Sequence, residues 1–216
     1  MDILAFTGGP FAENTYVILC GDGKSALLVD PGAAAPEALD VIEAKGLEVP
    51  AILLTHAHLD HIDGLAEAKR RTDAPVYLHP ADRTLFDNAG SQAAMFGVPF
   101  EDPPPPDFDL VPGEPLTFGG ETFEVLFTPG HAPGHVTFVA KSAPVAIVGD
   151  VIFAGSIGRT DLPGGDLKIL MESIRTQVLT LPGATRLYPG HGPETTVQHE
   201  ARTNPYVIPL YGGEFV

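Results

Sequence analysis

Residues 51–61 have the sequence AILLTHAHLDH, in which an apolar run is followed at once by a polar cluster. The apolar run at 51–54 has the length of a buried strand. The cluster carries imidazole and carboxylate groups, the ligands that zinc, iron and manganese accept. A solvated polar loop is the alternative. The density of candidate ligands favours a metal site at the end of a rigid strand, formed by His56, His58, Asp60 and His61.

The bulk composition is typical of a globular protein. The chain has 216 residues, 44% of them hydrophobic, enough for a substantial core in one domain over residues 1–216. No apolar stretch approaches the roughly 18 residues that span a bilayer. The N-terminus lacks the basic segment of a signal peptide. Because the lone Cys20 cannot form an internal disulfide, we expect a cytoplasmic protein with no membrane partner.

The charge balance argues against one class of partner. The formal net charge is −16, and the sequence has only 12 Lys and Arg residues. A nucleic-acid-binding protein needs a basic face to displace counterions from phosphates. No basic stripe is visible in the sequence, so we expect no nucleic-acid partner.

The first half of the sequence alternates strands with helices. Turn residues and proline mark the boundaries between the apolar segments. This alternation is typical of a layered α/β structure. The predicted order is strand, strand, helix, strand, helix and strand, at residues 11–20, 25–30, 36–44, 51–54, 62–71 and 76–78.

The second half is predicted to be richer in strands. A region that is helical in two pieces, 80–97, is followed by a proline-rich stretch at 101–107, which we interpret as a stiff connector between two halves of one domain. The pattern as a whole predicts two β-sheets packed face to face with helices outside. The remaining strands are expected at 114–118, 122–127, 136–140, 145–148 and 185–188, and the remaining helices at 167–179 and 194–202.

Three further polar clusters each follow a predicted strand. They have the sequences TPGHAPGH at 128–135, VGD at 148–150 and YPGHG at 188–192. Each has a structural alternative when taken alone, such as a turn or a helix cap. Pro133 and Gly134 argue against a helix between His131 and His135, so only one of these histidines need face a metal. Together the clusters favour a metal centre.

The order H-x-H-x-D-H, P-G-H, G-D and P-G-H-G resembles the metallo-beta-lactamase superfamily over nearly the whole chain. Residues 155–161, GSIGRTD, resemble the glyoxalase II group of hydroxyacylglutathione hydrolases, in particular its short, single-domain bacterial members. This resemblance implies the α/β fold of that superfamily, a four-layer αββα sandwich. Two mixed β-sheets are flanked by helices, and the metals lie at one edge of the sheets.

The resemblance also implies two divalent metal ions, zinc first, with iron or manganese as alternatives. The ligands of the first ion would be His56, His58 and His131. Those of the second would be Asp60, His61 and His191, with Asp150 bridging the two ions. His135 and Asp30 are expected to support these ligands through hydrogen bonds, although Asp30 is equally well explained as the first residue of an Asp-Pro-Gly turn.

The implied activity is hydrolysis of a thioester such as a hydroxyacylglutathione by a hydroxide that bridges the two metals. Asp150 and Asp60 are the expected catalytic residues, and Asp60 would also orient the hydroxide. Arg159 fills the place of a basic substrate-binding residue, although a solvent-exposed Arg without a ligand explains it equally well. The tyrosines that assist glutathione binding in these relatives are replaced by Asp161 and Pro193.

Other activities remain as alternatives. One is hydrolysis of another ester or a lactone, because the replaced tyrosines weaken the case for glutathione. Another is a persulfide dioxygenase that uses a single iron, which the full second ligand set disfavours. The sequence leaves the oligomeric state open. The apolar tail at 206–216 is expected to pack against another surface.

Overall fold

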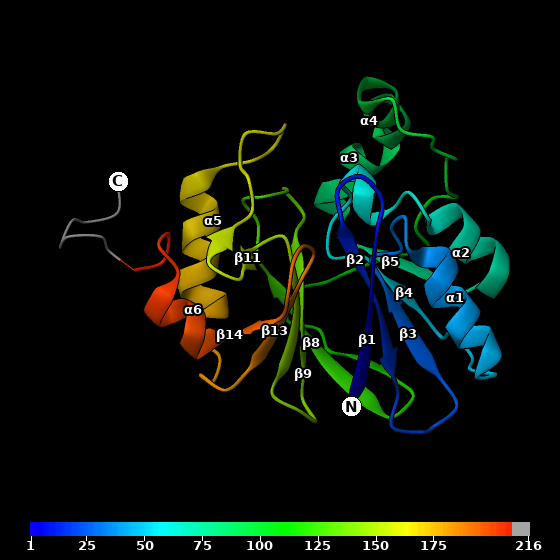
Figure 1. Cartoon of the computed structure of the whole chain (residues 1–216), viewed down its shortest axis with the longest axis horizontal. Coiled ribbons are helices and arrows are strands. Elements are labelled where there is room, and N and C mark those ends of the chain that lie inside the picture. The colour runs from blue at the N-terminus through cyan, green and yellow to red at the C-terminus, as the bar shows by residue number, and fades with distance from the viewer. Residues whose placement is uncertain (209–216) are drawn as a thin grey trace.

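Two six-stranded β-sheets packed face to face, with helices on their outer faces, form the protein (Figure 1). The structure is a computed structural model that describes residues 1–208. This arrangement confirms the predicted α/β four-layer sandwich. Most of the apolar tail at 206–216 lies outside the described residues. That all 216 residues form one domain stays a prediction.

The first sheet follows the order of the chain. Strands β1 to β3 are antiparallel hairpin neighbours, and β3 to β6 are parallel, so the sheet is mixed. Parallel neighbours need crossover connections, and the helices of this half supply them. The strands are β1 (Asp2–Gly8), β2 (Glu13–Leu19), β3 (Ala26–Val29), β4 (Ile52–Leu53), β5 (Val76–Leu78) and β6 (Phe108–Asp109).

The helices of this half cover the outer face of the first sheet (Figure 1). Leu28 of β3 packs on this side, whereas its neighbours Leu27 and Val29 face the second sheet, as the two-residue period of a strand requires. The helical elements are α1 (Ala35–Ala44), a 3-10 turn (Leu59–His61), α2 (Leu65–Thr72), a second 3-10 turn (Pro80–Asp82), α3 (Arg83–Asp87) and α4 (Ala89–Phe96).

The second sheet has the order β14-β13-β10-β9-β8-β7 and is also mixed, because only β10 and β13 are parallel. A small hairpin, β11–β12, lies beside it, and the last helices cover its outer face. The elements are β7 (Leu116–Phe118), β8 (Glu121–Phe127), β9 (Val136–Ala140), β10 (Val145–Gly149), β11 (Ile152–Phe153), β12 (Ser156–Ile157), α5 (Leu167–Ser173) with a π-helical continuation (Ile174–Val178), β13 (Arg186–Pro189), β14 (Thr195–Thr196) and α6 (Val197–Thr203).

The core between the sheets is built from large apolar side chains of both. Ile18 and Leu53 from the first sheet meet Phe123, Phe138 and Ile147 from the second, and all five are fully buried. Burying side chains of this size contributes about 1.5–3 kcal/mol each. The sheets are therefore held at a fixed separation, and so are the loops at their common edge.

Several element boundaries differ from the sequence predictions. The helix predicted from residue 62 begins at Leu65, because a 3-10 turn occupies Leu59–His61. The strand predicted at 51–54 is reduced to Ile52–Leu53. Strand β1 was not predicted, although its sequence, DILAFTG, contains the short apolar run ILAF; its side chains are exposed or half-buried. None of the helices in the described part of the chain combines the length and apolar character needed to cross a membrane.

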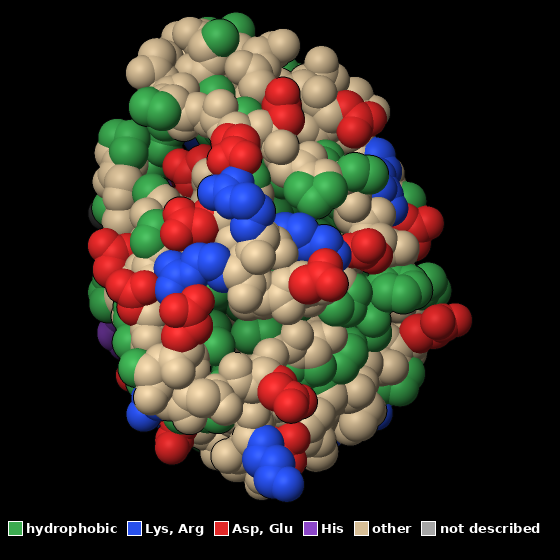
Figure 2. Space-filling model, turned by 90° about the vertical axis from the view of Figure 1, so that its right-hand side faces the viewer, with side chains coloured by type: hydrophobic (Ala, Val, Ile, Leu, Met, Phe, Trp, Pro, Cys, Tyr) green, Lys and Arg blue, Asp and Glu red, His purple; other side chains and the backbone are tan. Residues whose placement is uncertain are grey.

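Positively charged side chains on the face formed by α1 and α2 are paired with acidic ones (Figure 2). Arg71 contacts Asp40 at 2.7 Å, Glu43 at 2.7 Å and Glu67 at 3.3 Å. Arg70 similarly contacts Glu101. Blue and red side chains are interspersed over this face and form no continuous basic patch.

Candidate metal centre

The predicted ligands converge at one edge of the two sheets. Strands β3, β4 and β5 are parallel, and β1 runs in the same direction, so the segments that follow all four strands meet at that edge. The second sheet does the same, because β8, β10 and β13 share one direction. Carboxyl ends of parallel strands are a common place for functional sites. Here they carry Asp30, residues 56–61, His131, Asp150 and His191.

The first cluster consists of His56, His58 and His131. His58 Nδ1 lies 2.7 Å from His131 Nε2, which lies 3.2 Å from His56 Nε2. All three side chains are buried. Burial lowers the pKa of His58 to about 3 and that of His56 well below its usual value. Neutral imidazoles are the form that binds metal. For comparison, nitrogen ligands of one tetrahedral zinc ion lie roughly 3.3 Å apart.

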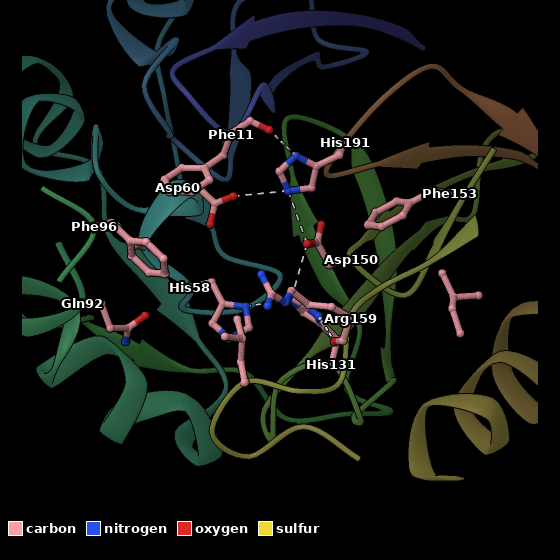
Figure 3. A pocket seen from close by; sticks show the side chains of 13 residues that line it. Phe11, His58, Asp60, Gln92, Phe96, His131, Asp150, Phe153, Arg159 and His191 are labelled. Carbon is pink, nitrogen blue, oxygen red and sulfur yellow. Dashed lines mark hydrogen bonds and ion pairs between the residues drawn. The ribbon is translucent and has the colours of Figure 1, made fainter. Parts of the chain in front are cut away.

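The second cluster consists of Asp60, His61 and His191. His191 Nε2 lies 3.3 Å from Asp60 Oδ2. Asp150 stands between the clusters: its Oδ1 is 3.4 Å from His61 Nε2, and its Oδ2 is 3.4 Å from both His131 Nε2 and His191 Nε2 (Figure 3). Burial raises the pKa of Asp150, but the neighbouring histidines, His61 first, outweigh that effect and hold it well below its usual value. This carboxylate therefore joins both clusters.

Hydrogen bonds fix the orientation of four of the histidines. His131 Nδ1 donates to the Arg159 carbonyl at 2.7 Å, and His191 Nδ1 donates to the Phe11 carbonyl at 3.0 Å. Asp30 Oδ2 lies 3.1 Å from His61 Nδ1 and also accepts the hydroxyl of Thr55 at 2.6 Å. That hydroxyl oxygen in turn lies 3.0 Å from the Nδ1 of His56. With Nδ1 engaged, each ring directs its Nε2 at the centre.

His135 contacts the backbone of Asp150 and belongs to neither cluster. Its Nε2 accepts the backbone N–H of Asp150 at 3.0 Å, so its Nδ1 carries the proton and donates to Thr128 Oγ1 at 3.0 Å. The ring is fully buried. His135 thus holds the backbone of the bridging residue, and His131 is the histidine of this loop that joins the first cluster.

The donor set fits metal ions. His58 Nε2, His61 Nε2 and Asp150 Oδ1 are buried and have no hydrogen-bond partner within the described residues. A buried polar group without a partner costs about 1–3 kcal/mol, and these three nitrogen and oxygen atoms are of the kinds that bind divalent metals. Gly190 provides the necessary room, because a Cβ there would collide with Asp150 Oδ1 and the His61 ring. The sequence prediction of ligands at these positions is consistent with this geometry.

Asp82 is a site residue that sequence reasoning missed. Its carboxylate accepts the N–H of Ala57 at 3.0 Å and that of Gly134 at 2.5 Å. Ala57 lies between two histidines of the first cluster, and Gly134 lies in the loop that carries His131. Burial raises the pKa of Asp82 to about 6. The only sequence signal was its place shortly after the strand β5, beside the strand that delivers the histidines.

Arg159, which was predicted to bind substrate, lines the cavity beside the two clusters. Its side chain is exposed and binds Asp161 through two hydrogen bonds of 2.7 Å each. Its carbonyl, by contrast, orients His131. Arg159 therefore contacts His131 through its backbone carbonyl, whereas its guanidinium is bound to the carboxylate of Asp161.

A cavity of about 320 Å³ opens beside the two clusters (Figure 3). The polar side chains of the centre form its floor, and several apolar side chains form its walls. The walls were not predicted from the sequence, because they come from distant segments. The wall residues include Phe11, Leu59, Phe96, Phe153, Ile157 and Leu162, together with Gln92 and Arg159.

The fold and site define a metal-binding protein of the two-sheet sandwich class, and comparison with known proteins identifies its family. The sequence profile of the metallo-beta-lactamase superfamily matches residues 8–191. The chain therefore belongs to this superfamily of metallo-hydrolases, which, with the His and Asp clusters, supports a hydrolytic enzyme.

Individual relatives extend over almost the full length of the chain. A probable metallo-hydrolase, YqgX of Bacillus subtilis, is 42% identical, with 92% of this chain and 94% of the relative covered. The hydroxyacylglutathione hydrolase GloC of Haemophilus influenzae is 39% identical, with 91% and 93% covered. The crystal structure of TTHA1623 in a di-iron-bound form superimposes with a TM-score of 0.86 at 43% identity, covering 94% of this chain and 99% of that one.

Proposed function

We propose that this protein hydrolyses thioesters, hydroxyacylglutathiones among them, at a centre of two metal ions. The observation that carries the proposal is the position of Asp150, whose carboxylate lies 3.4 Å from His131 of the first cluster and from His61 and His191 of the second. A single metal ion would need only the first cluster. The completeness of the second cluster, Asp60, His61 and His191, supports two ions.

Metal ions in these ligand sets would lower the pKa of a bound water to roughly 7 and polarise the substrate carbonyl. The protein supplies the rest. Asp60 lines the cavity and is half-buried, so its carboxylate is placed to accept a hydrogen bond from the attacking water and set its direction. Asp150 contacts histidines of both clusters and so fixes the position of one ligand set relative to the other.

The reaction needs only water as a co-substrate. The water oxygen bonds to the carbonyl carbon, the carbon–sulfur bond breaks, and the products are a carboxylic acid and a thiol that takes up a proton from the water. Within the described residues, the cavity lining contains no Ser, Thr or Cys. This favours direct attack by water over a covalent acyl-enzyme.

The relatives support the finer parts of the proposal. The relative from Haemophilus influenzae is named a hydroxyacylglutathione hydrolase, which favours a thioester substrate. Zinc is the first choice for the metal because His and Asp ligands suit it. The di-iron-bound structure of a relative makes iron the leading alternative. We place the protein in the cytoplasm, since its lone Cys20 is a buried free thiol.

Metal analysis combined with a thioester assay tests the proposal. Purified protein should hold two equivalents of metal per chain and hydrolyse S-D-lactoylglutathione or an uncharged acyl thioester, and His58→Ala should abolish the turnover. The alternative function, a persulfide dioxygenase, requires one iron and consumption of oxygen with glutathione persulfide. That result, or a metal-loaded protein inactive on every thioester, would contradict the proposal.

A further inference from the structure

The cavity beside the metal centre has an aromatic wall built from two separate elements. Phe11 lies in the turn between β1 and β2, and Phe96 is the last residue of α4. Their rings meet edge to face, with centroids 5.6 Å apart. Although they contact each other, Phe11 is 37% and Phe96 50% exposed. Both line the cavity, so this exposed aromatic surface is available to a ligand.

The opposite side of the cavity is apolar as well. Phe153 of β11 lies across the polar cluster from Phe11 and Phe96 (Figure 3), and its ring is 5.8 Å from the ring of His191. Ile157 of β12 continues this side. A group held over the metal ligands therefore has aromatic or aliphatic surface on both flanks, and apolar surface contributes about 25 cal/mol per Å² removed from water.

The cavity offers little to an anionic group away from the metals. Arg159 is the only cationic side chain among the described residues that line it, apart from the histidines of the centre. Two of its three nitrogens, Nε and one terminal nitrogen, donate to Asp161 at 2.7 Å. A substrate carboxylate would therefore compete with Asp161 for the guanidinium charge. Gln92 adds a neutral hydrogen-bonding group only.

We propose that the walls formed by Phe11, Phe96 and Phe153 bind an uncharged aromatic or branched aliphatic acyl group, which makes apolar acyl thioesters the preferred substrate class. This inference rests on the proposed thioester hydrolysis and narrows it. The cavity volume of about 320 Å³ suits a small acyl group. Glutathione, with two carboxylates of its own, finds no uncommitted cation on these walls.

A matched pair of thioesters tests the preference. The phenylacetyl and succinyl thioesters of N-acetylcysteamine are similar in size, but only the succinyl group carries a charge. For the metal-loaded protein we expect kcat/KM to be at least about tenfold higher for the phenylacetyl thioester. Equal values, or a preference for succinyl, would overturn the inference.

Substitutions locate the effect at the aromatic wall. Phe96→Ala should raise KM for the phenylacetyl thioester about tenfold with little change in kcat, and Phe96→Leu should restore most of the loss. Met95→Ala is the matched control, because Met95 is the neighbouring residue of α4, is 82% exposed and does not line the cavity. An unchanged KM in Phe96→Ala would refute the assignment.

A binding measurement separates this inference from the proposed function. Ketones in which a methylene group replaces the thioester sulfur cannot be hydrolysed, and their binding is measurable by calorimetry. If no thioester is turned over, the proposed function fails. The aromatic wall is then still tested: the phenylacetyl ketone should bind more tightly than the succinyl ketone, and Phe96→Ala but not Met95→Ala should weaken it. Equal affinities would overturn the wall's role.

Discussion

The two ligand clusters differ in how they face solvent. The first, His56, His58 and His131, consists only of imidazoles, and none is more than 5% exposed. The second contains a carboxylate, and the side chains of Asp60 and His191 are 19% and 26% exposed. The buried cluster is built like a structural site, with rigid neutral ligands. Both clusters border the cavity, but the second, the open cluster, is the more exposed to solvent, so we expect water to reach it more readily.

The largest effect is expected where the two clusters meet. Asp150→Asn keeps the size of the side chain but removes the charge shared by both clusters. We expect a loss of roughly three orders of magnitude in kcat/KM, equivalent to about 4 kcal/mol of transition-state stabilisation. Thioester kinetics with metal analysis would measure it. Asp87→Asn, on the exposed surface of α3, is the control and should retain activity. An active Asp150→Asn enzyme would contradict a bridging role.

Single-histidine variants sharpen the comparison of the clusters. His191→Ala removes a ligand of the open cluster and should leave one metal equivalent per chain, held by the buried histidines. His58→Ala should lose the buried ion instead, and a titration with chelator should release metal from wild type in two stages, the open cluster first. The exposed His199 provides a control, because His199→Ala should keep both equivalents. Release in one stage would argue against two unequal sites.

Asp82 tests the rigidity of the buried cluster. Asp82→Ala leaves the N–H groups of Ala57 and Gly134 without an acceptor, at a cost of about 2 kcal/mol in the free energy of unfolding. Because these groups lie in the ligand loops, metal affinity should fall about tenfold or more. Chemical denaturation and metal titration measure the two effects. Asp87→Ala serves as the exposed control, and normal metal affinity in Asp82→Ala would show that the loops are held by other contacts.

The buried carboxylate of Asp82 also makes the stability of the folded protein depend on pH. Burial raises the pKa of Asp82 to about 6 in the folded protein, above roughly 3.9 for an unfolded Asp. The folded state therefore binds more protons between these values, and the contribution of Asp82 to stability falls as the pH rises from about 4 through about 6. Denaturation at several pH values should show this decline in wild type and a shallower one in Asp82→Ala. Identical slopes would assign the decline to other groups.

The smallest expected effect concerns the exposed ion pair between Arg159 and Asp161. Asp161→Asn removes the charge that holds the Arg159 guanidinium, which then becomes available to a substrate carboxylate. An exposed pair of this kind is worth little, so we expect only about a two- to fivefold gain in kcat/KM for a succinyl thioester. The phenylacetyl thioester should be unaffected, which makes it the internal control. A gain for both substrates would indicate a change in the loop rather than in charge recognition.

The sequence predicted the fold, and which His and Asp residues come together in two clusters, better than it predicted the surroundings of the site. The candidate ligands could be recognised in the sequence because they lie in short loops directly after strands, and because four of them are crowded into residues 56–61. Asp82 and the aromatic walls of the cavity could not be predicted, because no local sequence pattern marks them. They reach the site only through the tertiary structure. Strand β1 was missed although residues 3–6, ILAF, are apolar, because a run of four apolar residues does not by itself identify a strand.

Each ligand cluster draws on both sheets: two ligands follow β4, and the third follows a strand of the second sheet. An ion bound at either cluster would therefore cross-link the two layers, in addition to their apolar packing and hydrogen bonds such as that from Tyr16 to the Pro189 carbonyl. Binding that requires both layers to be docked stabilises the docked state, by about 4 kcal/mol at a thousandfold excess of ion over its dissociation constant. The supply of metal would thus determine the stability of the folded protein as well as its activity.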